Sequence, residues 1–171
     1  YGMSLSNFKT IFFWEYFHRL WGRLLGLAFG LPLIALALTG RVPNGFGRRL
    51  FLLLLLGGFQ GVVGWWMVKS GLTETASVSQ YRLATHLSLA LIIFSLLVWT
   101  GFDLRDGRDR YPTGQGLATL ILLGITIVAG ALVAGMDAGL LYNEYPFMGH
   151  GLIPVEYGEV GWLDPFENPA S

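Results

Sequence analysis

The residues most able to do chemistry form a short polar cluster beside a long apolar stretch. Glu15, His18 and Arg19 lie within one short segment, and Arg23 follows four residues later. Residues three and four apart share a face of a helix, so this spacing predicts an acid, an imidazole and two guanidinium groups side by side. Ionisable side chains at membrane depth are costly and mark functional sites by default. Arginines near a helix end can instead extend to the membrane interface, and that alternative stays open for both arginines.

A second cluster of the same kind follows later in the chain, where Arg82 and His86 are four residues apart. Two imidazoles can supply the axial ligands of a haem iron, and arginines can pair with the haem propionates. A zinc site needs a third or fourth ligand, for which Glu15 is the obvious donor. The residue types therefore favour haem over zinc, with His18 and His86 as candidate ligands of the iron.

Two further polar residues have less specific interpretations. Gln60 lies in the middle of an apolar run, where an interhelical hydrogen bond and a contact in a haem pocket are equally good interpretations. His150 lies between two glycines, and a surface histidine is the better interpretation there. The chain has three histidines and no cysteine, which excludes disulfides and thiolate metal sites.

Four long apolar stretches must position these side chains. Of the 171 residues, 53% are hydrophobic and 13% are charged, whereas a soluble domain has about 25% charged residues. The stretches lack the charged stripes of a soluble helix bundle. Each is long enough to cross the hydrocarbon core, which takes about 20 apolar residues. We therefore predict an all-α, integral membrane four-helix bundle. It forms a single membrane domain over 1–171, with helices at about 18–40, 50–69, 83–103 and 113–136 and an external loop at 137–171.

The loops between these stretches are short, so neighbouring helices are expected to be antiparallel. The first and third loops carry six arginines: Arg41, Arg48, Arg49, Arg105, Arg108 and Arg110. The positive-inside rule places these loops on the cytoplasmic side. The first and third helices then run in the same direction, so His18 and His86 are predicted at one depth near the outer face. The zero formal net charge and the lack of a polybasic run argue against nucleic acid as a partner.

Four stretches, in order along the chain, resemble the haem A synthase family of the mitochondrial and alphaproteobacterial type. They are residues 8–23, 60–72, 78–87 and 134–143. The resemblance implies an eight-helix protein of two similar four-helix halves, which converts haem O to haem A for cytochrome oxidase. A ring methyl group is oxidised to a formyl group by successive hydroxylations. This chain would be an N-terminal part with the family's second to fifth helices, lacking the first helix and the C-terminal half and inactive by itself.

The resemblance also implies roles for the two clusters. The positions matched by Glu15, His18 and His86 belong to the family's site for the substrate haem, and the C-terminal half carries another histidine pair that binds haem b. The residues themselves suggest further haem contacts, namely Arg19, Arg23, Arg82 and Gln60. The arginines would pair with propionates or orient the carboxylate.

The implied setting is the bacterial cytoplasmic membrane, or the mitochondrial inner membrane, with the histidine end facing the periplasm or the intermembrane space. Implied partners are membrane lipid, haem O, an electron donor, haem O synthase, cytochrome oxidase assembly factors and a second copy of the chain. Two alternatives are a non-catalytic b-type membrane cytochrome that passes electrons, and an assembly subunit without a cofactor. Glu15 separates the enzyme from the cytochrome, because electron transfer needs the histidines and not the carboxylate.

Overall fold

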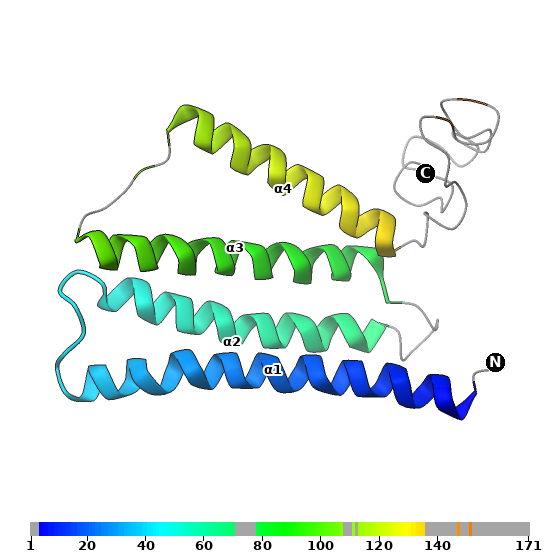
Figure 1. Cartoon of the computed structure of the whole chain (residues 1–171), viewed down its shortest axis with the longest axis horizontal. Coiled ribbons are helices and arrows are strands. Elements are labelled where there is room, and N and C mark those ends of the chain that lie inside the picture. The colour runs from blue at the N-terminus through cyan, green and yellow to red at the C-terminus, as the bar shows by residue number, and fades with distance from the viewer. Residues whose placement is uncertain are drawn as a thin grey trace. The chain divides into compact units, whose positions relative to one another are not determined.

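The computed structural model of the chain describes residues 4–70, 78–107, 111, 113–135, 147 and 151. They contain four long α-helices (Figure 1): α1 at Leu5–Leu38, α2 at Gly47–Ser70, α3 at Gln80–Asp106 and α4 at Gly114–Gly135. Each helix is long and apolar enough to cross a membrane. The prediction of an all-α membrane fold with four long helices is confirmed. The external loop predicted at 137–171 lies outside the described residues, apart from Phe147 and Gly151.

Helix α1 begins at Leu5, well before the start of the span expected at 18–40. Ser4 caps its first turn, because the Ser4 side chain accepts a hydrogen bond from the backbone N–H of Asn7 at 3.2 Å. No glycine or proline interrupts the following residues before Gly22, so the helix continues through the polar cluster. With 34 residues and a rise of about 1.5 Å per residue, α1 is longer than the hydrocarbon core, which is about 30 Å thick.

The structure divides into two compact units, Tyr1–Gly61 and Val62–Ser171. In the first unit, the chain turns after α1 through Gly40, whose φ is 65°, and returns as the first half of α2. A Cβ atom on the buried Gly30 would lie 3.4 Å from the Leu54 Cδ1 atom, so the two helices approach closely there. Most of the large apolar side chains of α1 are exposed, as expected for a helix whose solvent is lipid.

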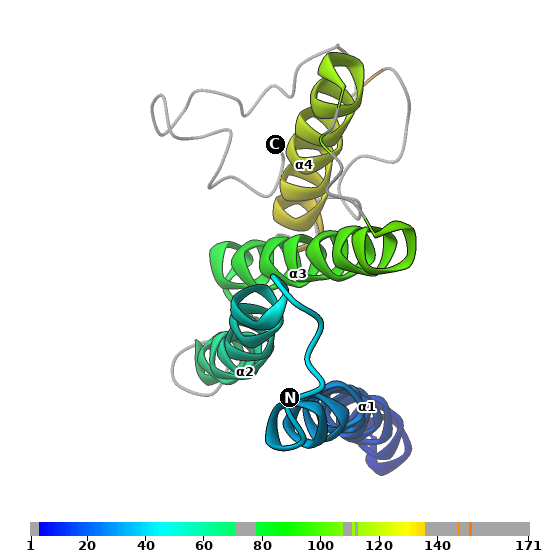
Figure 2. The ribbon, with the colours of Figure 1, turned by 90° about the vertical axis from the view of Figure 1, so that its left-hand side faces the viewer.

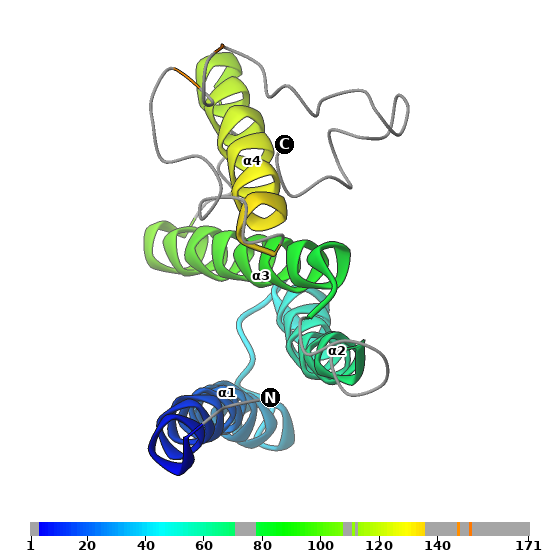
Figure 3. The ribbon, with the colours of Figure 1, turned by 90° about the vertical axis from the view of Figure 1, so that its right-hand side faces the viewer.

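The second unit contains the end of α2 together with α3 and α4. Helix α3 ends at Asp106 and is capped by Gly107, which has a φ of 65° and donates its N–H to the Asp103 carbonyl at 2.9 Å. Helix α4 packs against α3. The two helices are closest where α3 begins and α4 ends, and they diverge toward the other end (Figure 1). Figures 2 and 3 show the same crossing of α3 and α4 from opposite sides.

The close end of this helix pair depends on a glycine. A Cβ atom on Gly135 would lie 2.7 Å from both the Cα and the Cβ of Gln80, whereas carbon atoms prefer a separation of about 3.5–4.0 Å. We expect Gly135→Ala to force the helices apart and to lower the free energy of unfolding by about 1–3 kcal/mol. Thermal unfolding in mild detergent measures the change.

Gly130→Ala is the matched control for that variant. No other described atom lies within 4 Å of the position that a Cβ on Gly130 would take, the helix's own nearby backbone aside. Alanine there is expected to be neutral or to stabilise α4 by up to about 1 kcal/mol, because alanine has the higher helix propensity. Equal unfolding midpoints for Gly130→Ala and Gly135→Ala would contradict the close approach at Gln80.

Candidate functional site

The polar cluster of α1 is built around an ion pair. The Arg19 Nη2 atom donates a hydrogen bond to the Glu15 Oε1 atom, one helical turn earlier. The Arg19 and Glu15 side chains are 50% and 44% exposed. The spacing of these two residues in the sequence thus brings their side chains into contact.

Beside this pair, the surface of α1 is open. His18 and Arg23 are both exposed. Within the described part of the chain, nothing beyond the local helix backbone comes within 4 Å of the Cβ positions of Gly22 and Gly26. Glycines at this spacing let a flat ligand or another backbone approach a helix closely. The surface around His18 therefore has room for a planar group such as a porphyrin.

Two rows of aromatic rings flank the same part of α1. Their ring centroids are 5.9–6.4 Å apart, and the rows consist of Phe8, Phe12 and Tyr16, and of Phe13, Phe17 and Trp21. The second row lies on the side of the helix away from Glu15, since position 17 is rotated by about 200° from position 15. Aromatic rings are enriched where a helix passes through the membrane interface. This placement is typical of a polar cluster at interfacial depth.

His86 lies on α3, and its imidazole packs against the backbone of α2. A Cβ atom on Gly64 would lie 2.9 Å from the His86 Cε1, 3.4 Å from Nδ1 and 3.6 Å from Nε2. The histidine is half-buried. The ring therefore occupies space that a side chain at position 64 would fill.

Arg82, one turn before His86, connects the start of α3 to the end of α2. Its Nη1 atom donates a hydrogen bond to the Trp66 carbonyl at 2.9 Å. The guanidinium carbon lies 4.6 Å from the centroid of the Trp66 ring, within the range of a cation–π interaction. The sequence did not predict this contact, because no spacing within one helix identifies a partner on another. The carbonyl takes one of the five N–H donors of the guanidinium.

The predicted site residues lie in both units. Those in the first unit are Glu15, His18, Arg19, Arg23 and Gln60, and those in the second are Arg82 and His86. Gln60 is half-buried and its side-chain oxygen is shielded from solvent. The convergence of His18 and His86 on one haem stays a prediction, as does the part of Gln60 in the pocket.

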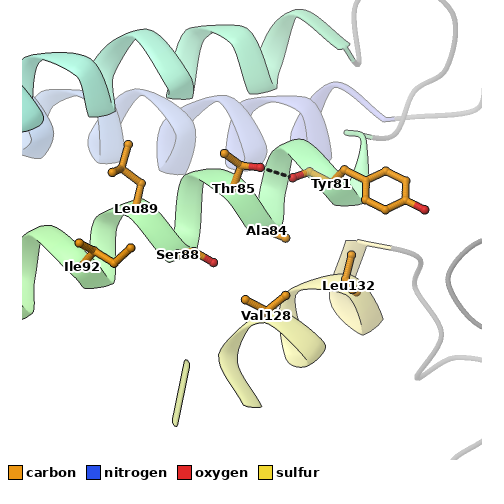
Figure 4. Close-up of a pocket in the computed structure, with 8 residues that line it drawn as sticks. All are labelled: Tyr81, Ala84, Thr85, Ser88, Leu89, Ile92, Val128 and Leu132. Carbon is orange, nitrogen blue, oxygen red and sulfur yellow. Dashed lines mark hydrogen bonds between the residues drawn. The ribbon is translucent and has the colours of Figure 1, made fainter. Parts of the chain in front are cut away.

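Helix α3 also borders a pocket of about 490 Å³ that it forms with α4 (Figure 4). Most of the lining residues are apolar. The Thr85 hydroxyl donates a hydrogen bond to the Tyr81 carbonyl at 2.7 Å within α3. The pocket lies on a different side of α3 from His86, since Ser88 in its lining is rotated by about 200° from that position. The sequence did not predict it, because its residues are common in any apolar helix.

The available donors fit a haem better than a bare metal ion. Among the residues that the structure describes, no group of three His, Asp or Glu side chains could hold a metal ion. A zinc site takes three or four protein ligands. A porphyrin supplies four nitrogen ligands of its own, so one or two imidazoles complete the coordination of its iron. The exposed imidazole of His18 can supply such a ligand, and the nearby guanidinium groups can pair with propionates.

Comparison with known proteins places the chain in a family. A family model described as cytochrome oxidase assembly protein matches residues 1–171. The chain belongs to this family. It is 51% identical to the haem A synthase of Parvibaculum lavamentivorans, over 90% of the chain and 46% of that relative. It is 50% identical to the haem A synthase of Agrobacterium fabrum, over 98% of the chain and 48% of the relative. The haem A synthase of Rhodospirillum centenum is 46% identical over 99% of the chain and 48% of its own length.

The family membership confirms the resemblance found in the sequence. The chain spans about half the length of the curated relatives it matches. No solved structure matches it. The roles of the individual site residues stay predictions.

Proposed function

We propose that the protein containing this chain is a haem A synthase, which oxidises a methyl group of haem O to a formyl group and so supplies haem A for cytochrome oxidase. The observation that carries the proposal is the 50% identity to a haem A synthase over 98% of the chain. The paired Glu15 and Arg19 beside the exposed His18 support it independently, since they combine an iron ligand, a carboxylate and a cation on one open surface.

In this proposal the imidazoles of His18 and His86 hold the haem iron. Arg23 and Arg82 bind the propionates through charge-assisted hydrogen bonds. Arg19 orients the Glu15 carboxylate, which accepts a proton from the reacting centre or stabilises positive charge that develops there. The haem would be the substrate, and these residues would hold and orient it. Gln60, with its shielded side-chain oxygen, contributes a polar contact to the pocket.

The wider setting is part of the same proposal. The arginines at the ends of α1 and α3 and the start of α2 favour the cytoplasmic side for those ends, which directs the histidine end toward the periplasm or the intermembrane space. The other half of the full protein, which completes two four-helix repeats, holds haem b. An electron donor supplies reducing equivalents, haem O synthase supplies the substrate, and assembly factors or a second copy of the protein associate in the membrane.

The proposal is tested with the full-length protein in cells that make haem O and lack their own haem A synthase. We expect haem A in the pigment extract, and a Soret band from the protein purified in mild detergent. This chain expressed without the other half is expected to form no haem A. Bound haem that is never converted would identify an electron-transfer cytochrome instead. A purified protein without a Soret band would identify an assembly subunit without a cofactor.

A further inference from the structure

We propose that Gly64 is a positioning residue for the His86 imidazole. The missing side chain at Gly64 leaves the space beside the α2 backbone in which the ring sits, and this fixes where its nitrogen atoms lie. The consequence for haem rests on the proposed function, in which His86 holds the iron. The position of the ring itself depends only on the contact between Gly64 and His86.

A side chain at Gly64 would require the His86 ring to shift. A Cβ atom there would lie 2.9 Å from the His86 Cε1, and relaxing that contact to an ordinary carbon–carbon separation takes a shift of about 0.6 Å or more. Both ring nitrogens are nearly as close, at 3.4 and 3.6 Å. Because the ring is rigid, a shift of Cε1 would turn the whole imidazole about its side-chain torsions and would move both nitrogen atoms.

Contacts of Arg82, one turn before His86, also connect α3 to α2. They oppose a movement of α3 away from α2. The Arg82 side chain is bonded to the Trp66 carbonyl at 2.9 Å and stacked on the Trp66 ring. Positions 64 and 66 of α2 thus face positions 86 and 82 of α3. With the start of α3 tethered, the strain from a side chain at Gly64 falls on the imidazole itself.

Two neighbouring glycines of α2 lack such a contact. Gly61 is one turn earlier on the same helix, and no other described atom lies within 4 Å of its Cβ position, apart from the adjacent helix backbone. The same holds for Gly57. Of these three glycines, Gly64 alone has a neighbour that an added methyl group would displace.

The first test compares Gly64→Ala with the matched control Gly61→Ala in the full-length protein. Partners that orient a metal-binding histidine typically contribute about 10–100-fold to affinity. We therefore expect Gly64→Ala to weaken haem O binding by about 10–100-fold and to shift the Soret band as His86→Ala does. Gly61→Ala is expected to keep the wild-type spectrum. A Gly64→Ala protein with the wild-type haem content and spectrum would overturn the inference, provided that His86→Ala loses haem.

A second test does not depend on haem and therefore separates this inference from the proposed function. It compares the unfolding midpoints of the haem-free wild type, Gly64→Ala, His86→Ala and the double variant. We expect Gly64→Ala to lower the midpoint when His86 is present and not when the ring has been removed. If Gly64→Ala fails to fold, the double variant is expected to fold again. An equal cost of Gly64→Ala in both backgrounds, or a double variant that also fails to fold, would show that Gly64 does not act through His86.

Discussion

Replacement of both His18 and His86 by alanine is expected to lower the content of haem O and haem A in the purified full-length protein by at least about tenfold, because the iron loses both of its nitrogen ligands from this chain. The methyl group of alanine cannot coordinate iron. Because His18 is exposed and His86 is half-buried beside a glycine, neither replacement breaks up a packed core. The absorption spectrum and the pigment extract of the purified protein measure the effect.

The third histidine of the chain provides the matched control. His150 lies outside the described residues, and its sequence context predicts a surface histidine, so His150→Ala should keep the full haem content. Haem b in the other half is expected to remain in the double variant, which shows that the protein is still folded. Unchanged haem O and haem A in the double variant would mean that these histidines are structural, and the proposed site would be wrong.

Much of the fold follows from the sequence, because four apolar stretches without charged stripes have few other solutions. The helix bounds follow less well. Hydropathy detects the part of α1 that suits lipid, whereas the helix itself continues to Leu5, since Ser4 caps it there and nothing breaks it before. Hydrogen bonding within the backbone, and not hydropathy, decides where a helix ends.

In the site, likewise, contacts within one helix follow from the sequence, whereas contacts between helices do not. The contact between Glu15 and Arg19 follows from their spacing of four residues, because helix geometry alone brings such side chains together. The contact between Gly64 and His86 depends on how α3 is rotated and how closely it approaches α2, and these properties arise from packing between helices. A pattern within one helix carries no information about them.

The Glu15→Gln variant is expected to retain haem and to form haem A about 10²–10⁴-fold more slowly, because an amide cannot take part in proton transfer. Glutamine has nearly the same shape as glutamate, and the lost ion pair with Arg19 joins two side chains that are about half exposed. Such a pair contributes about 0–1 kcal/mol to stability. A large loss of product at constant haem content therefore has to come from the chemistry and not from folding.

Asp106→Asn is the matched control for the chemical change. It also converts a carboxylate to an amide in an ion pair with an arginine, since the Arg105 Nε atom lies 3.0 Å from the Asp106 Oδ1 atom. This pair is at the C-terminal end of α3, whereas His86 is near the start of that helix. We expect this variant to convert haem O at the wild-type rate. Wild-type conversion by Glu15→Gln would remove the carboxylate from the reaction and leave Glu15 a partner of Arg19 alone. A loss confined to Glu15→Gln separates an enzyme from an electron-transfer cytochrome, because a cytochrome with the same two histidines needs no carboxylate at this position.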